Sequence, residues 1–249
     1  MTSRDDLDRY FATLLEPERF EDYGPNGLQI EGKREVAKLV SGVTASLALI
    51  EAAVDARADA IFVHHGLFWR GHAGPLTGWL KKRVALLMKH DISLFAYHLP
   101  LDDHPVHGNN AQLGAKLKFV IEDRFGKQRL GFIGRAPQPM TGAALAALLQ
   151  FRLARAPVVA EGDGRMIKRI AWCTGGAQGY FEAAIAAGAD AYLTGEISEP
   201  QAHIARETGV AFYACGHHAT ERYGAPAVAA QAAELFALEH QFIDIENPA

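Results

Sequence analysis

The sequence predicts an α/β protein with a largely parallel, doubly wound sheet, and three observations support this prediction. Short runs of branched and aromatic residues alternate with alanine-rich stretches whose apolar residues recur at helical spacing. This alternation is typical of strand–helix–strand units with parallel strands. The second observation is that one segment recurs later in the chain. The third is that polar or glycine residues directly follow five of the predicted strands. Ligands of open α/β sheets bind at that edge, beyond the carboxyl ends of the strands.

The predicted elements follow one another along almost the whole chain. A first helix is expected over residues 5–15, capped by Ser3 or Thr2. Strands are expected over residues 39–43, 60–63, 93–97, 130–133, 167–173, 191–194, 210–214 and 242–245. Helices between them are expected over residues 47–56, 78–89, 143–152, 181–187, 199–206 and 227–238.

An internal repeat indicates two related α/β halves. Residues 51–60 align with residues 182–191 at a constant offset of 131, and seven of these ten positions are identical. Alanine, glycine and aspartate are common where a helix leads into a strand, so coincidence is the simpler alternative. If the halves are related, residues 64–65 correspond to residues 195–196, and both copies end a strand with polar residues at one edge.

Composition excludes several classes of protein. The chain has 249 residues, 49% of them hydrophobic, and a net charge of −4, which argues against disorder and gives no basic footprint for nucleic acid. No apolar run approaches the roughly 20 residues of a membrane-spanning helix. The acidic start does not resemble a secretory signal, and two cysteines form no disulfide framework. We therefore expect a cytoplasmic protein.

Histidines gather after three of the predicted strands. Seven of the 11 histidines lie in these segments: His64, His65, His98, His104, His107, His217 and His218. Imidazoles and carboxylates without paired thiolates suit Zn²⁺, Fe²⁺, Mn²⁺ or Ni²⁺. His217 and Glu221 are four residues apart and would share one face of a helix.

The number of donors predicts two metal ions. Adjacent strand residues point in opposite directions, so His64 and His65 would serve two ions or lie in a bend. Five ligands exceed what one catalytic ion with an open position needs, but they suit two ions with a bridging carboxylate. The five candidates are His64, His65, Asp102, His217 and Glu221.

Several residues have competing interpretations. His98 either contacts metal or substrate or makes a core hydrogen bond, and spacing does not separate Asp102 from Asp103. Glycines 175 and 176 could hold an anion at a helix start or form a tight turn. His104 and His107 are expected to face solvent. Ordinary hydrogen-bonded or buried roles are expected for His72, His90, His203, His240 and Cys215, and His218 is the poorer ligand beside His217.

Six motifs resemble one family in order and spacing. They span residues 23–32, 63–66, 97–102, 108–111, 193–196 and 216–222. The sequence resembles the Nif-three-like dinuclear metal-centre proteins, also called GTP cyclohydrolase I type 2 homologues, in their bacterial YbgI-like branch. The resemblance runs from about Asp22 to residue 245 and is loosest over residues 121–165.

The resemblance implies two α/β domains, the second inserted into the first. The metal-binding domain would comprise residues 1–125 and about 195–249, and the inserted domain about 126–194. It also implies a ring-shaped homohexamer with two divalent ions per subunit facing an internal cavity.

The resemblance also implies roles for particular residues. One ion would be held by His64, Asp102 and Glu221. The other would be held by His65, His217 and the same Glu221, which bridges the two ions. His98 and Glu196 match positions near the metals and would support the ligands, contact substrate or move a proton.

The predicted function is that of a metal-dependent hydrolase with a small-molecule substrate. The family name points to opening of the guanine ring of GTP with release of formate. The sequence has no P-loop, and a phosphoesterase or an amide-bond hydrolase would use the same two ions equally well. The alternative is a non-catalytic assembly that stores, delivers or senses metal or acts as a scaffold. A third interpretation is oxygen or redox chemistry at two iron ions.

Overall fold

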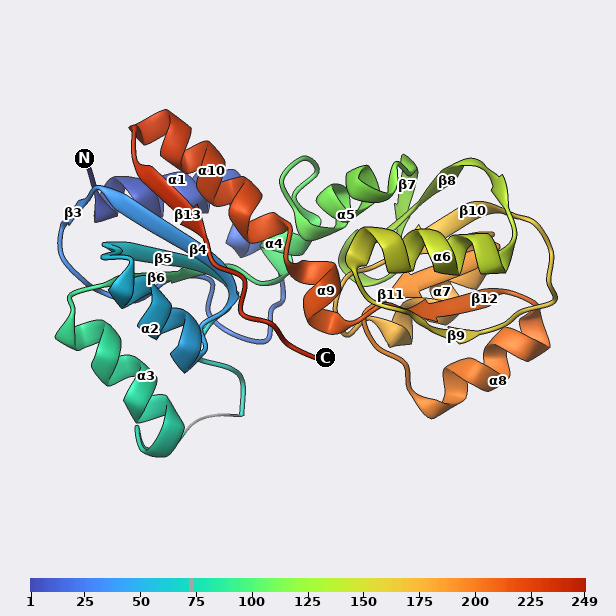
Figure 1. The fold of residues 1–249 in the computed structure, drawn as a ribbon, viewed down its shortest axis with the longest axis horizontal. Helices are drawn as coiled ribbons and strands as arrows, with labels where there is room; N and C mark the ends of the chain where they lie inside the picture. The colour runs from blue at the N-terminus through green and yellow to red at the C-terminus, as the bar shows by residue number, and fades with distance from the viewer. Residues whose placement is uncertain (72–73) are drawn as a thin grey trace. The chain divides into compact units, whose positions relative to one another are not determined.

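The chain forms two compact units, each with its own sheet. The computed structural model describes residues 1–71 and 74–249. The first unit comprises Met1–Gly108 and Arg222–Glu246, and the second comprises Asn109–Glu221 and Asn247–Ala249. In both units helices cover the sheet and the central strands are parallel (Figure 1), so the predicted α/β class is confirmed.

The first unit has a five-stranded sheet in the order β13-β4-β5-β6-β2. Four neighbouring strands are parallel, and β2 pairs antiparallel with β6 at one edge. The strands are β2 (Gly27–Ile30), β4 (Lys38–Thr44), β5 (Ala60–His65), β6 (Ser93–Ala96) and β13 (Glu239–Phe242), with a separate antiparallel pair of β1 (Thr2–Ser3) and β3 (Glu35–Val36). The last strand lies three residues before the predicted 242–245.

Helices pack on both faces of this sheet. Phe62 of β5 joins α1 and α10 in one apolar cluster, whereas its neighbours Ile61 and Val63 join α2 and α3 in the other. This alternation is the period of two expected of a strand covered on both faces. The hydroxyl of Ser3 accepts the N–H of Asp6 and caps α1, as predicted. The helices are α1 (Arg4–Leu15), α2 (Leu47–Asp55), α3 (Gly78–Lys89), α4 (Leu99–Asp103) and α10 (Gly224–Phe236), with a 3₁₀ turn η1 (Pro17–Arg19).

The second unit has a six-stranded mixed sheet in the order β7-β8-β10-β11-β12-β9. The three strands β10, β11 and β12 are parallel, and the flanking strands are antiparallel to their neighbours. The strands are β7 (Val120–Phe125), β8 (Gly131–Met140), β9 (Val158–Ala160), β10 (Ile167–Trp172), β11 (Ala191–Thr194) and β12 (Ala211–Ala214). The helices are α5 (Asn109–Leu117), α6 (Gly142–Leu153), α7 (Phe181–Ala186), α8 (Glu199–Thr208) and α9 (His217–Glu221), with 3₁₀ turns η2 (Lys127–Arg129) and η3 (Gln178–Tyr180).

Large aromatic residues fill the core of the second unit. The ring of Phe181 in α7 stacks on Tyr192 of β11, with centroids 5.9 Å apart. Trp172 of β10 donates from its indole N–H to the carbonyl of Asn110 in α5, at 2.9 Å. The hydrogen bond satisfies the polar end of a fully buried tryptophan. None of the helices in the described part of the chain is long and apolar enough to cross a membrane.

The second unit is longer than the predicted insertion of residues 126–194. Strand β7 precedes residue 126 and strand β12 follows residue 194, yet both belong to the same sheet as β8, β10 and β11. A boundary at 125 or 194 would therefore separate hydrogen-bonded neighbours within one sheet. The divisions of the chain fall after Gly108, after Glu221 and, for the last three residues, after Glu246.

The internal repeat extends well beyond the ten aligned residues. In the first unit Oδ2 of Asp59 accepts the backbone N–H groups of residues 37 and 38, at 2.7 and 2.9 Å. In the second unit Oδ2 of Asp190 accepts those of residues 168 and 169, at 2.9 and 3.0 Å. Each of these positions differs by 131, as do the first residues of the edge strands β2 and β9. The same local structure therefore occurs in both units.

Candidate metal centre

Two histidines end the central strand β5 of the first unit. The His64 side chain is fully buried, and its Nδ1 donates to the carbonyl of Tyr97 at 3.1 Å. Nδ1 of His65 lies 3.0 Å from the hydroxyl of Thr44, at the end of the neighbouring strand β4. The two ring centroids are only 4.5 Å apart. Both histidines are still part of β5, so the expected bend after the strand is not present, yet their rings lie close together.

His98 joins this pair from the end of strand β6. Its Nδ1 lies 2.6 Å from Oδ1 of Asp22, a carboxylate that is 8% exposed. Asn26 bonds to Oδ2 of Asp22 through its amide at 2.9 Å and accepts the backbone N–H of His98 at 2.7 Å. Burial raises the pKa of Asp22, but its hydrogen bond and attraction to His98 outweigh burial and hold that pKa below its usual value. Asp22 is thus ionised and orients the imidazole.

Asp102 is the carboxylate of the first unit that faces His64. It lies on the short helix α4, and its Oδ1 is 3.6 Å from Nε2 of His64. Its side chain is nearly buried, with a residue exposure of 6%. Spacing alone does not distinguish Asp102 from Asp103, whereas the structure places Asp102 beside the candidate ligand.

The second unit brings together an imidazole and two carboxylates at the same edge of its own sheet. Glu196 follows β11, while His217 and Glu221 begin and end α9 after β12. Nδ1 of His217 lies 2.7 Å from Glu196, and its Nε2 lies 3.0 Å from Oε2 of Glu221. The predicted sharing of one helix face by His217 and Glu221 is therefore correct.

The charge of these carboxylates dominates the chemistry of His217. Burial lowers the pKa of His217, but the hydrogen bonds and negative charges of Glu221 and Glu196 outweigh it and raise this pKa to about 9. Glu221 is only 2% exposed. A cation beside buried carboxylate oxygen is favoured, whether it is a proton on His217 or a metal ion in its place.

Two glycines make room for these residues. Gly175 has a φ of +69°, and a Cβ at this position would overlap Oε1 of Glu221. Its N–H donates to the hydroxyl of Thr220 at 3.0 Å. A Cβ on Gly195 would come within 2.6 Å of Cα of His217. Of the two interpretations of glycines 175 and 176, the tight turn is therefore supported.

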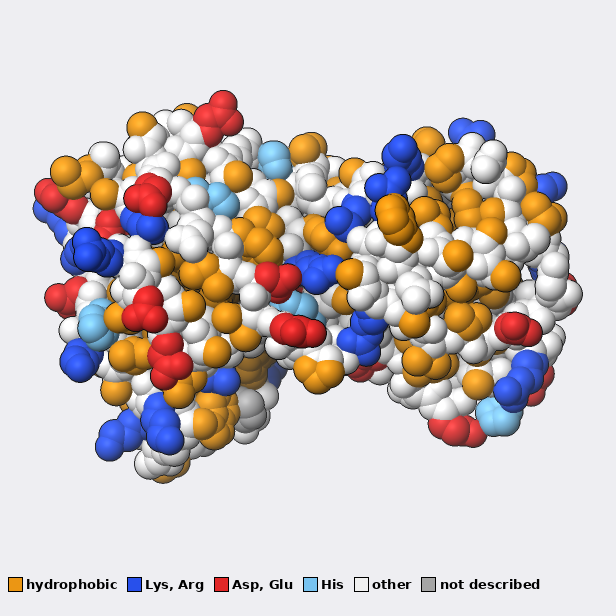
Figure 2. All heavy atoms as spheres, in the orientation of Figure 1, with side chains coloured by type: hydrophobic (Ala, Val, Ile, Leu, Met, Phe, Trp, Pro, Cys, Tyr) orange, Lys and Arg blue, Asp and Glu red, His pale blue; other side chains and the backbone are white. Residues whose placement is uncertain are grey.

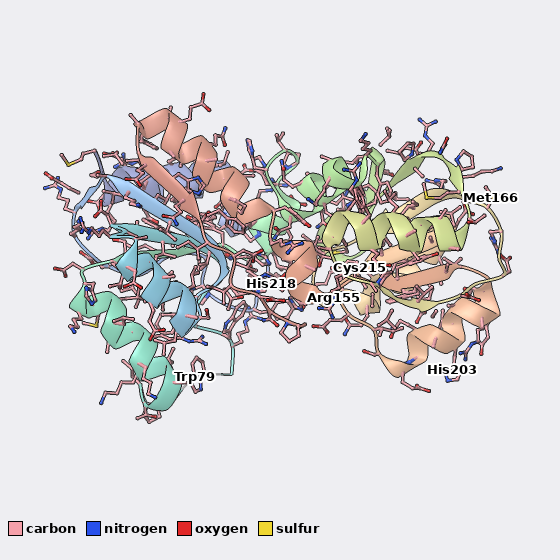
Figure 3. All side chains as sticks on the ribbon, viewed as in Figure 1. Trp79, Arg155, Met166, His203, Cys215 and His218 are labelled. Atoms are coloured by element: carbon pink, nitrogen blue, oxygen red, sulfur yellow. The ribbon has the colours of Figure 1, made fainter. Side chains whose placement is uncertain are left out.

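Three further histidines lie outside these clusters. His203 on α8, labelled in Figure 3, pairs with Glu199 at 2.8 Å. Nε2 of His240 lies 2.9 Å from the Ser41 hydroxyl. His90 is an exposed residue at the end of α3. These three have the ordinary roles predicted for them. His72 lies outside the described residues.

The loop after α4 departs from expectation. His104 and His107 are half-buried rather than solvent-facing, with ring centroids 5.2 Å apart. Nδ1 of His104 accepts the N–H of His107 at 2.9 Å and so closes the loop. Cys215, which follows β12, and His218 of α9 are labelled in Figure 3. Both are buried, and Cys215 is a free thiol as predicted.

The donor chemistry fits a divalent metal ion. One ligand atom from each of His64, His65 and His98 lies within 4.8 Å of the other two, and further His, Asp and Glu residues could hold an ion. Imidazole nitrogen and carboxylate oxygen are the donors that borderline divalent metals prefer. The fold and these clusters define an α/β protein with candidate metal-binding residues at the carboxyl edge of each sheet.

The chain belongs to the Duf34/NIF3 (NGG1p interacting factor 3) family, whose model matches residues 2–248. It is 52% identical to a GTP cyclohydrolase 1 type 2 homolog of Neisseria meningitidis serogroup A, over 100% of both chains. A protein of the same name from Pseudomonas aeruginosa is 51% identical over 98% of this chain and 96% of its own. The solved structure of protein ybgI, described as of unknown function, has a TM-score of 0.96 and 43% identity over 100% of both chains. The resemblance to this family is confirmed.

Sequence reasoning missed the residues that hold the imidazoles in place. Asp22 contacts His98 across 76 residues of sequence, and Thr44 contacts His65 across 21. An aspartate before a glycine- and proline-rich loop carries no signal for such a distant partner. Gly175 is visible as part of a glycine pair, but its closeness to Glu221 follows only from the three-dimensional structure.

Proposed function

We propose that this chain binds two divalent metal ions and is a metal-dependent hydrolase. The observation that carries the proposal is shared by four histidines. Nδ1 of each lies within hydrogen-bond distance of a protein oxygen: the Tyr97 carbonyl for His64, the Thr44 hydroxyl for His65, Asp22 for His98 and Glu196 for His217. Histidines that bind metal through Nε2, as proposed for His64, His65 and His217, characteristically have this second contact, which fixes the ring and its tautomer. The same kind of contact fixes the ring of His98.

The ligands in this proposal are the five residues that the sequence predicts. His64, Asp102 and Glu221 are buried, and the other two are half-buried. Buried imidazoles and carboxylates favour a cation that compensates their charge and lone pairs. Glu196, in contact with Nδ1 of His217, positions that ligand. The full set comprises His64, His65, Asp102, His217 and Glu221.

The chemistry would be hydrolytic. A bound divalent ion lowers the pKa of coordinated water and polarises a substrate oxygen. His98 is positioned to take part in proton transfer through Nε2, because its contact with ionised Asp22 keeps the ring proton on Nδ1. The names of the curated relatives make GTP the first substrate to test, with opening of the guanine ring and release of formate.

The test joins metal analysis to turnover. Purified protein would be loaded with Zn²⁺, Mn²⁺, Fe²⁺ or Ni²⁺ and assayed with GTP, a chromogenic phosphate ester and a peptide panel. The proposal expects about two ions per chain and turnover that His65→Ala and Glu221→Ala abolish. Metal binding without turnover of any of these would favour a metal carrier, sensor or scaffold instead. A chain without bound metal would contradict the whole proposal.

We also propose a homohexamer, as the family resemblance implies. Helix α6 offers one apolar surface for self-association. Its Phe151 is 79% exposed, and apolar side chains gather on the face of the second unit that α6 covers (Figure 2). An exposed apolar patch of this kind is typical of an interface. Sedimentation equilibrium of the wild type and Phe151→Asp would test it, with a six-chain mass expected for the wild type and smaller species for the variant.

A further inference from the structure

The second unit contains a cavity of about 330 Å³ at the amino ends of its parallel strands, whereas its candidate metal ligands follow the carboxyl ends. Ile167 begins β10, Asp190 directly precedes β11 and Ala211 begins β12, and all three line the cavity. The start of α6 and the loop between β9 and β10 lie at this same end of the sheet (Figure 1). Sites for small molecules commonly have volumes of about 300–1,000 Å³, so a compact ligand fits here.

Apolar side chains form the wall of this cavity. Ala143 and Ala146 contribute to it from α6, Val159 from β9 and Ile167 from β10. Ile167 is 2% exposed, whereas Val159, on the edge strand, is 37% exposed. Because alanine side chains are small, the helix leaves space between itself and the sheet. A wall of this composition suits the hydrocarbon part of a ligand better than a fully hydrated ion.

Tyr213 of β12 adds a polar group to the wall. The residue is 1% exposed, and its hydroxyl donates to the carbonyl of Gly142 at 3.1 Å. With its proton used in this way, the hydroxyl presents only acceptor lone pairs to a ligand. Burial raises the pKa of Tyr213 to about 12, and the negative charge of Glu161 adds to this effect. The hydroxyl of Thr141 caps α6 by accepting the N–H of Ala144 at 3.2 Å.

Two carboxylates line the cavity with oxygen atoms to spare. Oδ2 of Asp190 accepts the backbone N–H groups of residues 168 and 169, at 2.9 and 3.0 Å. Within the described part of the chain, no hydrogen bond engages its Oδ1, and neither a hydrogen bond nor an ion pair engages Glu161. Both carboxylates can therefore accept hydrogen bonds from a ligand that donates them.

The charge of Arg165, which also lines the cavity, is compensated by its own loop. Its Nε donates to both oxygens of Asp163, at 2.8 and 2.9 Å, and its Nη2 donates to the carbonyl of Thr208 at 3.5 Å. The hydrogen bonds from Arg165 lower the pKa of Asp163 to about 2, so this partner is ionised. Asp163, Glu161 and Asp190 thus set three negative charges against one positive charge. The surroundings of the cavity favour a cation.

We propose that this cavity binds a small organic cation, a protonated primary amine on a compact apolar body. The apolar wall holds the body of the ligand, and Glu161 and Oδ1 of Asp190 accept hydrogen bonds from its ammonium group. Hydrogen bonds between two charged groups are about twice as strong as those between neutral groups, so the charge of the ligand decides its affinity. The inference is independent of the proposed hydrolase, because the cavity lies at the other end of the strands.

Three probes of similar shape test the chemical class of the ligand. Phenethylamine is a cation at neutral pH, phenethyl alcohol is uncharged and hydrocinnamate is an anion. Equilibrium dialysis of the full chain measures the affinity of each, and only binding that Ala146→Phe removes is assigned to the cavity. We expect phenethylamine to bind at least about tenfold more tightly than phenethyl alcohol, and hydrocinnamate to bind most weakly. Equal affinities, a preference for hydrocinnamate or no binding of phenethylamine would overturn the proposal.

Matched variants test the wall and the charge. Ala146→Phe fills the cavity from α6 and should abolish binding of phenethylamine, whereas Ala186→Phe, at an exposed alanine of α7 outside the lining, should leave it unchanged. Glu161→Gln keeps the size of the side chain but removes its charge. It should weaken phenethylamine binding by about tenfold and leave the affinity for phenethyl alcohol unchanged.

Glu182→Gln, at an exposed carboxylate of α7 outside the lining, is the control for charge and should have no effect on either probe. Equal phenethylamine affinity in Glu161→Gln and the wild type would overturn the role of Glu161. Thermal unfolding of each variant distinguishes a filled cavity from an unfolded chain. Glu161 is exposed, so its substitution tests the proposal even if Ala146→Phe fails to fold.

Discussion

The two units share a framework but present different donors at the edge where their parallel strands end. In the first unit the strand after the repeated helix ends in His64 and His65. In the second unit the equivalent positions, 131 residues later, are Gly195 and Glu196. The first edge is rich in imidazole nitrogen and the second in carboxylate oxygen. The comparison teaches that the sheet supplies a place for ligands, whereas the residues just beyond each strand determine the chemistry.

A second pair of equivalent positions shows the same principle on a smaller scale. Thr44 in the first unit corresponds to Gly175 in the second. The Thr44 hydroxyl contacts Nδ1 of His65, whereas the missing side chain of Gly175 leaves room for the carboxylate of Glu221. One position therefore anchors a ligand in one unit and accommodates a ligand in the other.

The largest expected effect comes from giving the first unit the residues of the second. His64→Gly combined with His65→Glu removes two imidazoles, so we expect metal affinity of the first unit's donors to fall by about 1,000-fold, or about 4 kcal/mol. Zinc competition in the background lacking His217 and Glu221 measures it. Affinity equal to that of the parent would show that the two edges are interchangeable and that the comparison is mistaken.

The reverse exchange, Gly175→Thr, should disturb the second unit. The new Cβ would overlap Glu221, and the positive φ at this position disfavours a branched side chain. We expect about 100-fold weaker binding of metal that depends on Glu221, equivalent to about 2.7 kcal/mol. Metal titration of the otherwise wild-type chain is the measurement. Gly179→Thr, at a glycine whose Cβ would meet nothing within 4 Å, is the control.

Substitutions at the amino ends of the strands, opposite the candidate ligands, should change the stability of the fold rather than its metal affinity. Asp59→Ala leaves two backbone N–H groups and Lys33 without their acceptor in a nearly buried position, so we expect a loss of about 2–3 kcal/mol in the free energy of unfolding. Asp190→Ala removes the same two hydrogen bonds at a more exposed site and should cost about 1–2 kcal/mol. Urea unfolding measures both, and equal losses would contradict the role of burial.

The stability difference between the wild type and Asp59→Ala should also depend on pH. Burial raises the pKa of Asp59, but Lys33 and the backbone N–H groups outweigh it and hold the pKa below its usual value. The stabilisation is therefore complete above the unfolded value of about 3.9 and is lost as the pH falls through the lower, folded value. Unfolding curves of wild type and Asp59→Ala should converge in acid. A gap that persists at pH 2 would assign the loss to packing rather than charge.

The smallest expected effect concerns the anchor of His65. Thr44→Val keeps the shape of the side chain but removes the hydroxyl beside Nδ1. We expect metal affinity of the first unit to fall by about tenfold, as for other losses of a contact that orients a ligand. Ser41→Ala is the control. Ser41 lies on the same strand as Thr44, and this variant removes the hydroxyl that contacts His240, so the metal affinity should stay unchanged.

Sequence patterns predict the central strands better than the edges. Strands β4, β5, β10, β11 and β12 are largely buried, and each appears where a predicted strand lies. Edge strands β2, β7 and β9 are absent from the prediction, because β7 contains the charged residues Glu122, Asp123 and Arg124 and the other two strands have only four and three residues. Strand β13, with the pattern Glu-His-Gln-Phe, is half polar, and its predicted position is three residues late.

The candidate ligands can be predicted from the sequence, but the residues that position them cannot. Histidines and carboxylates after strands are local signals, and helical spacing alone joins His217 to Glu221. The contacts of Asp22 with His98 and of Gly175 with Glu221 depend on how distant loops fold together. No periodicity encodes such contacts. The unit boundaries escape prediction for a similar reason, because only strand pairing shows that β7 and β12 belong to one sheet.

The paired aspartates have a consequence for how this molecule tolerates change. Asp59 and Asp190 fasten the starts of their strands, at the edge of each sheet remote from the candidate ligands. Substitutions of these aspartates should reduce the quantity of folded protein, while each molecule that folds retains its affinity for metal. Substitutions of the candidate ligands should leave the quantity of folded protein unchanged and lower the metal affinity of every molecule. Inherited variants of this chain should therefore divide into two phenotypes according to which end of a strand they alter.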